Sequence, residues 1–243
     1  FSLNRSKVLV LSEDKDIFGG ELDNTILKDQ LNLMRVGEPM YVFYGYVEDG
    51  YDENGHIVYK NMDDDPAITA ADKTIIGDPN PDFLVNLTTA VSYKGFTLSA
   101  FFQSSIGNDI YSLSMAAQAY DYGYNGNTLR EVYYNHWTPE NPTAKYPNLD
   151  QTSYKMSDRF VYDGSFVRLK NLELAYDVPC ARSKFIKRAR VYVSAQNLFT
   201  ITSYPFWDPD INANGGGSSM IQGVDSYCYP SARTYTIGCR LTF

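Results

Sequence analysis

An acidic segment between residues 61 and 72 has the residue types and the spacing of a calcium-binding loop. Side chains that carry oxygen stand at its first, third, fifth and twelfth positions, which are Asn61, Asp63, Asp65 and Asp72. EF-hand loops place calcium ligands at this spacing, and calcium takes six or more oxygens. Asn61 replaces the usual first Asp, Pro66 stands where Gly makes the sharp turn, and Asp72 replaces the bidentate Glu. Calcium is therefore a candidate ligand, and a solvated Asp-rich turn is the alternative.

Aromatic side chains, which could stack on a ligand, are abundant, with 21 Tyr and 13 Phe in 243 residues. Several fall in segments that we expect to be loops: Tyr120, Tyr122, Tyr124, Tyr133, Tyr134, Trp137 and Trp207. Tyr133, Tyr134, Trp137 and Trp207 are candidates for stacking on sugar rings or for docking a partner. Membrane-interface aromatics and loop packing are the alternatives.

Catalytic chemistry has little support. The two histidines, His56 and His136, lie in separate expected loops, so a histidine metal site or a catalytic triad is not indicated. Three cysteines give neither a disulfide framework nor a CxxC metal pair. A net charge of −8 argues against nucleic acid as a partner, because phosphate binding needs a basic patch. We predict a protein that is not an enzyme and that requires no cofactor, with calcium as the one candidate.

The end of the chain carries the clearest structural pattern. From 233 to 243 apolar and polar residues alternate, which is the period of a β-strand. Bacterial outer-membrane barrels end in such a strand with a terminal aromatic residue, and their assembly machinery recognises that end. We therefore predict a strand with one face toward lipid and a barrel C-terminal signal formed by Tyr235, Ile237, Cys239, Leu241 and Phe243.

Further strands are expected over 83–93, 96–102, 166–177 and 190–202. Lys94-Gly95 predicts a tight hairpin turn, because Gly supplies a positive φ. The alternation within 166–177 changes phase near Asn171, which predicts a β-bulge there. Weaker patterns predict strands over 31–36 and 41–47 and a loop over 11–24.

Short and long links alternate along the chain. The links 94–95 and 178–189 are short, whereas those over 48–82, 108–165 and 203–232 are long. Outer-membrane barrels have short periplasmic turns and longer extracellular loops, and with a periplasmic C-terminus the strand count places all three long links outside. Within 108–165 we expect a short helix that begins with a Thr128/Glu131 capping box and ends at Pro139.

No run of 18 apolar residues occurs, so a transmembrane helix is excluded, whereas barrel strands need only about 9–11 residues. The first residues have no basic, apolar or cleavage region of an export signal. We therefore expect that signal upstream, and the chain to be a C-terminal fragment of a longer protein.

Five runs of the sequence resemble the SusC/RagA family of TonB-dependent transporters: GDPNPDF at 77–83, WTPENPT at 137–143, FVRLKNLELAYDVP at 166–179, VYVSAQNLFTIT at 191–202 and YPSARTYTIGCRLTF at 229–243. The 61–77 segment is similar to a calcium-loop-like stretch of that family. The resemblance implies an all-β fold, in which residues 1–243 are an antiparallel transmembrane β-barrel segment with long extracellular loops. They would be the last third or so of a 22-stranded barrel, with the plug domain and the TonB box upstream.

The resemblance also implies a function. The whole protein would import an oligosaccharide or a peptide across the outer membrane of a Gram-negative, Bacteroidetes-type bacterium. Its partners would be a SusD-like surface lipoprotein, TonB through the missing N-terminal part, and the lipid bilayer. Two alternatives stay open: a small self-contained barrel with a structural or adhesive role, and a soluble sugar-binding β-sandwich. A sandwich would bury the apolar strand faces in a core, whereas a barrel would expose them.

Overall fold

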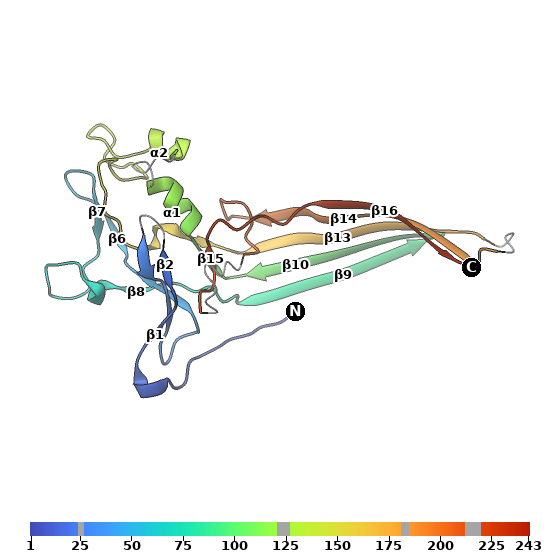
Figure 1. Cartoon of the computed structure of the whole chain (residues 1–243), viewed down its shortest axis with the longest axis horizontal. Helices are drawn as coiled ribbons and strands as arrows, with labels where there is room; N and C mark the ends of the chain where they lie inside the picture. The colour runs from blue at the N-terminus through green and yellow to red at the C-terminus, as the bar shows by residue number, and fades with distance from the viewer. Residues whose placement is uncertain (24–26, 121–126, 181–184, 212–219) are drawn as a thin grey trace.

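The computed structural model describes residues 1–23, 27–120, 127–180, 185–211 and 220–243. Five long strands form one sheet, which we call the wall, and a region of short strands and helices lies at one end of it, which we call the end region (Figure 1). The wall strands are β9 (Phe83–Tyr93), β10 (Phe96–Ile106), β13 (Phe166–Val178), β14 (Arg188–Thr202) and β16 (Thr234–Thr242). All five coincide with strands expected from the sequence.

The wall has the strand order β16-β14-β13-β10-β9, and each neighbouring pair is antiparallel. The sheet is open, with β9 and β16 at its two edges. Its strands are 9 to 15 residues long, which is enough to cross a bilayer at the usual tilt. The C-terminus and the β9–β10 turn lie at the end of the wall away from the end region (Figure 1).

The β9–β10 hairpin confirms the predicted turn. Lys94 and Gly95 have φ angles of 46° and 86°, so both central residues are left-handed, as a type I′ turn requires. Tyr93 pairs directly with Phe96 across this turn. The two-residue turn therefore fixes the register of the whole hairpin.

The predicted bulge is also confirmed. Against β10, Asn171 pairs with Phe101 and Leu169 pairs with Phe102, which leaves Lys170 as an extra residue in β13. A bulge changes the parity of alternation along its strand. It keeps Val167 and Leu169 on the same face of the wall as Leu172 and Leu174.

The end region contains two further sheets and two hairpins. A four-stranded sheet has the order β1-β4-β5-β8, and a three-stranded one has the order β12-β11-β15. Hairpins β2–β3 and β6–β7 pack with them. The bounds are β1 (Ile17–Phe18), β2 (Glu21–Asp23), β3 (Lys28–Gln30), β4 (Asn32–Met34), β5 (Val42–Gly45), β6 (Glu48–Tyr51), β7 (Ile57–Tyr59), β8 (Thr74–Gly77), β11 (Asp109–Ser112), β12 (Val161–Asp163) and β15 (Val224–Asp225).

The hydrophobic core lies in this end region. Its fully enclosed side chains come from segments far apart in the sequence and include Leu31, Phe43, Tyr111, Phe160 and Val224. A further part is supplied by α1 (Leu113–Tyr120), which is buried along nearly its whole length. The long links are therefore a packed unit rather than separate loops. None of the described helices is long and apolar enough to cross a membrane.

Of three expectations about short elements, two need correction and the one about the strands at 31–36 and 41–47 is confirmed. The expected helix exists as α2 (Arg130–Tyr134), but the predicted capping box is wrong, because the N-cap residue is Leu129 rather than Thr128. The Thr128 hydroxyl donates to the carbonyl of Gln118. The strands expected at 31–36 and 41–47 form as β4 and β5, in the end region. The segment 11–24, expected to be a loop, contains a 3₁₀ turn at Ser12–Asp14 and the strands β1 and β2, because each finds a backbone partner.

Candidate functional site

The wall has one apolar face built from aligned rows of side chains. One row runs across all five strands through Val91, Leu98, Leu174, Val193 and Ile237, and the next runs through Tyr93, Phe96, Tyr176, Val191 and Cys239. These side chains are open to the outside, up to 87% for Ile237. So large an exposed apolar surface needs a non-aqueous neighbour.

The dimensions of this face match a membrane. Phe83 and Tyr93 bound the apolar stretch of β9, which spans 11 residues. At about 3.3 Å per residue and a barrel tilt of about 40°, this stretch is roughly 25 Å tall, which is the height of the lipid-facing band of outer-membrane barrels. The stretch also ends in aromatic residues, as the interfacial girdles of such barrels do.

Both alternatives from the sequence are wrong. In a soluble sandwich the rows through Leu98 and Ile237 would be enclosed, yet these residues are 48% and 87% exposed. In a self-contained barrel the wall would close, yet among the described strands it is an open sheet of five.

The opposite face of the wall is polar. One of its rows passes only through small, charged or hydroxyl-bearing residues, namely Ala90, Ser99, Glu173, Ser194 and Thr236. Arg190 lies on this face, 3.6 Å from Glu173 and 3.7 Å from Asp177. Tyr192 covers Gly238, where an added Cβ would lie 2.4 Å from the ring. A hydrated passage needs such a surface.

A buried ion pair attaches the link 203–232 to this polar face. The Arg168 side chain on β13 is 2% exposed, and its guanidinium pairs with Asp208 and, at 3.2 Å, with Asp210. The Arg168 Nε atom also donates to the Thr200 hydroxyl at 2.8 Å. Asp208 accepts the backbone N–H groups of Asp210 and Ser231, at 2.9 Å each. These bonds hold the link against the wall.

Sequence reasoning missed this pair, although a signal existed. Arg168 stands among Phe166, Val167 and Leu169 in a strand, where an unpaired charge would be costly. Burial raises the pKa of Asp208, but the two backbone N–H groups and Arg168 outweigh it and hold that pKa below its usual value. Asp208 is therefore charged at neutral pH and balances Arg168.

A second buried carboxylate fixes the same link to the end region. Asp225 in β15 accepts a hydrogen bond from the Tyr204 hydroxyl at 2.6 Å and from the Ser114 hydroxyl at 3.2 Å. The Tyr204 hydroxyl also lies 2.9 Å from Ser112 Oγ. The link 203–232 thus bridges the wall and α1.

The acidic loop forms a chain of backbone turns. Side-chain oxygens of Asn61, Asp63 and Asp65 each accept the N–H group two residues ahead, at 2.8 to 3.0 Å. Asp72 is fully enclosed, and its two oxygens accept the N–H groups of Met62 and Thr69, at 2.7 Å each. These two bonds lower the pKa of Asp72.

The carboxylate of Asp72 is thus already engaged by backbone donors. Across the described part of the chain, no group of three or more His, Cys, Asp or Glu side chains is arranged to hold a metal ion. Asp72 also forms a capping box with Thr69 at a 3₁₀ turn over Ala70–Asp72. Calcium at this loop stays a prediction.

The candidate aromatic residues do not form one site. Tyr133 and Tyr134 lie on α2 with their rings 5.2 Å apart, and both are largely exposed. Trp137 packs over Gly55, where an added Cβ would lie 2.2 Å from the indole. Trp207 lies apart from them in the link 203–232 and stacks on Phe206. Tyr122 and Tyr124 lie outside the described residues.

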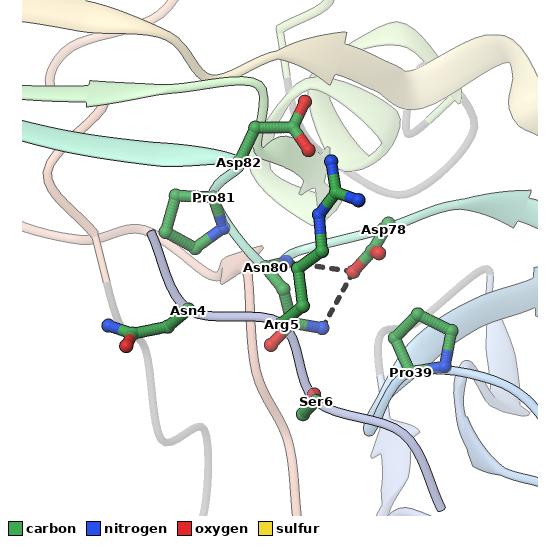
Figure 2. Close-up of a pocket in the computed structure, with 8 residues that line it drawn as sticks. All are labelled: Asn4, Arg5, Ser6, Pro39, Asp78, Asn80, Pro81 and Asp82. Atoms are coloured by element: carbon green, nitrogen blue, oxygen red, sulfur yellow. Dashed lines mark hydrogen bonds between the residues drawn. The ribbon is translucent and has the colours of Figure 1, made fainter. Parts of the chain in front are cut away.

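The GDPNPDF run at 77–83 joins the end region to the wall. With residues 4–6 and Pro39 it lines a small polar cavity of about 210 Å³. Figure 2 shows the Arg5 side chain pointing toward Asp82, while Asp78 accepts two hydrogen bonds from Asn80. The Asp78 N–H also donates to Asp109 at 2.8 Å. This network is a structural joint between β8 and β9.

The five residues of the predicted C-terminal signal lie on β16 or directly after it. Ile237 and Cys239 belong to the two apolar rows, Tyr235 lies on the same face beside them, and Leu241 pairs opposite Ala189. Tyr235, Ile237, Leu241 and Phe243 are between 46% and 87% exposed. Their role as a recognition signal stays a prediction.

Comparison with known proteins shows what this two-faced wall resembles. The chain is 32% identical over its whole length to TonB-dependent receptor P3 of Formosa agariphila, of which it covers 26%. It is 30% identical, over 86% of its length, to TonB-dependent receptor SusC of Bacteroides thetaiotaomicron, of which it covers 20%. No protein-family model matches the chain. The chain is SusC/RagA-like.

Solved structures agree with this assignment. The chain aligns over 99% of its length with structures of the RagAB peptide importer, at 25–26% identity and TM-scores of 0.76 and 0.79 in the open-open and closed-closed states. It covers 26% of those chains, so it spans about a quarter of the relatives that it matches. As part of a SusC/RagA-like receptor it lies in the outer membrane of a Gram-negative bacterium, and it is not an enzyme.

Proposed function

We propose that this chain forms wall and outer loops of a TonB-dependent importer that carries an oligosaccharide or a peptide across the outer membrane. The observation that carries the proposal is the wall itself, with an apolar face of membrane height and a charged, hydroxyl-rich face behind it. The similarity to a receptor named SusC and to the RagAB peptide importer supports the importer class.

An importer of this class would act with two protein partners. A SusD-like lipoprotein would cover the end region from outside, and TonB would act through the N-terminal part of the whole protein. The exposed pair Tyr133 and Tyr134 on α2 supplies candidate docking contacts. Replacing both by Ser should weaken co-purification of the lipoprotein, whereas Tyr229→Ser, an exposed tyrosine in another segment, should not.

We also propose how the chain is oriented in the membrane and which residues direct its assembly there. The end region, with links 48–82, 108–165 and 203–232, would face outside, and the Lys94-Gly95 turn would face the periplasm. Tyr235, Ile237, Cys239, Leu241 and Phe243 would form the assembly signal. Removing Phe243 should lower the amount of receptor in the outer membrane. An unchanged amount would contradict this role.

Calcium at Asn61, Asp63, Asp65 and Asp72 is a separate proposal that rests on the spacing of these residues. Protease cleavage within 61–72 should become slower when calcium is added to chelator-treated receptor. Equal cleavage rates with and without calcium would contradict it.

Deletion of the gene from its host tests the central proposal. The deletion strain should lose growth on one glycan or peptide as sole nutrient, and the intact gene should restore it only when TonB is present. Normal growth on every glycan and peptide that the parent strain uses would contradict an import role.

A further inference from the structure

A cavity of about 250 Å³ lies between the polar face of the wall and the link 203–232. Arg168 and Thr200 line it from the wall, Trp207 and Ser231 line it from the link, and Arg233 lies where the link enters β16. Clefts for whole small molecules measure roughly 300–1,000 Å³, so this cavity suits one unit of a longer ligand.

The groups around the cavity offer complementary chemistry. The Oδ1 atom of Asn197 is buried and has no hydrogen-bond partner among the described residues, while its Nδ2 donates to the Ala232 carbonyl at 2.9 Å. A buried acceptor without a donor is unfavourable. This oxygen has almost no exposed surface, so the Asn197 amide forms part of the cavity wall and is not an open acceptor for a ligand. The Thr200 hydroxyl accepts from Arg168 Nε, which leaves its own proton to donate.

Charge in the cavity favours an anion. The charges of Arg168 and Asp208 cancel, and both oxygens of Asp208 already accept hydrogen bonds. Arg233 is exposed and makes no ion pair within the part of the chain that the structure describes. Its guanidinium is therefore the free charge of the cavity, and such a group binds carboxylates in a bidentate manner.

Trp207 adds a flat apolar surface. Its indole stacks on the Phe206 ring at 4.8 Å with an angle of 18° between the planes, and 58% of the residue is still exposed. The stack fixes the orientation of the indole and leaves a face free for a sugar ring. The C–H groups of a sugar ring can pack on the electron-rich face of the indole, where they gain dispersion energy.

From these groups we infer that the cavity is a subsite for a carboxylate-bearing sugar, a uronate unit of an acidic oligosaccharide. Arg233 binds the carboxylate, Trp207 stacks on the ring, and the Thr200 hydroxyl donates to a ring hydroxyl. This inference rests on the proposed import function and narrows its substrate class.

Calorimetry on the purified full-length receptor tests the inference with tetramers of galacturonate, mannuronate and guluronate, with their methyl esters, and with a tetrapeptide. At least one acid tetramer should bind, and its ester should bind more weakly. Arg233→Gln should weaken binding of the acid roughly tenfold to hundredfold, the range of a lost charge-assisted hydrogen bond, and leave the ester unchanged. Trp207→Ala should weaken both.

Arg240→Gln is the matched control, because Arg240 lies on the same polar face of β16 but outside the cavity, and it should leave the affinity unchanged. The inference fails if no uronate binds, if acid and ester bind equally, or if Arg233→Gln changes nothing. Preferred binding of the tetrapeptide also overturns it. If gene deletion abolishes growth on a neutral glycan or a peptide while uronates do not bind, the import function stands and this inference falls.

Discussion

At the scale of single residues, two buried carboxylate networks determine where the link 203–232 lies. Arg168 and Asp208 attach it to the wall, and Asp225 with Tyr204 attaches it to α1. Removing one partner of a buried ion pair leaves an uncompensated charge, which costs more than the pair contributes. These networks therefore specify the position of the link.

Arg168→Gln should destabilise the receptor by about 3–5 kcal/mol, because it leaves the Asp208 carboxylate buried without a cation. Asp208→Asn should also destabilise it, and the double variant should cost clearly less than the sum of the two. Urea unfolding of the receptor in detergent micelles measures all three. Strictly additive costs would show that the two side chains do not act as a pair.

Asp72 predicts a pH dependence in the acidic loop. The Met62 and Thr69 N–H groups lower the pKa of Asp72 in the folded state. The ionised carboxylate therefore stabilises the folded loop fully above the ordinary pKa of 3.8, and this stabilisation is lost as the pH falls through the lower pKa of the folded state. Hydrogen exchange of segment 61–72, corrected for the intrinsic rate, should stay constant from neutral pH to about pH 5 and accelerate below 3.8.

Variants at the acidic loop provide the control for that measurement. Asp72→Asn should accelerate exchange at every pH, since it removes one of the two acceptor oxygens. Asp63→Asn should change it little, because an Asn oxygen can still accept the Asp65 N–H. Identical exchange in wild type and Asp72→Asn would contradict the role of the carboxylate.

At the scale of elements, the wall strands follow from simple alternation. The strands at 83–93 and 233–243 can be predicted from the alternation of apolar and polar residues within each segment alone. Lys94-Gly95 is compatible with only a few types of hairpin turn. The phase change near Asn171 even located the bulge at Lys170. These features depend on local sequence, so the sequence was sufficient to predict them.

Elements of the end region could not be predicted in the same way. The strands β1 and β15 are two residues long and exist only because distant segments pair with them. The start of the helix α1 could have been predicted, because Ser112 precedes it and the Ser112 hydroxyl accepts the Met115 N–H, as a helix-capping residue does. The predicted capping box at Thr128 is absent because α2 begins one residue later, with Leu129 as its N-cap, and Leu129 has no side-chain oxygen to accept an N–H group.

A pair of neighbouring substitutions tests the two faces of β14. Val193 belongs to an apolar row, whereas Ser194 lies on the polar face. Val193→Lys should destabilise the folded receptor in lipid by up to about 2–4 kcal/mol, while Ser194→Lys should be close to neutral. Refolding titrations in lipid vesicles measure the difference. A larger cost for Ser194→Lys would reverse our assignment of the faces.

At the scale of the whole molecule, the chain combines a rigid two-faced sheet with a packed end region, joined by the 77–83 run and by the link 203–232 (Figure 1). The sheet supplies the boundary between lipid and a hydrated interior. The link brings Trp207 and Arg233 beside the polar face. An importer needs both parts, a wall that excludes lipid and a surface that contacts its cargo.

Spin labels placed one at a time along β13 of the full-length receptor in bilayers test this account most directly. Accessibility to oxygen, which partitions into lipid, should peak at positions 167, 172, 174 and 176, with the parity changing at Lys170. Accessibility to a water-soluble nickel complex should peak at positions 171, 173 and 177, on the opposite face. Low oxygen accessibility along the whole strand, or peaks at residues such as Arg168 and Glu173, would contradict a lipid-facing wall.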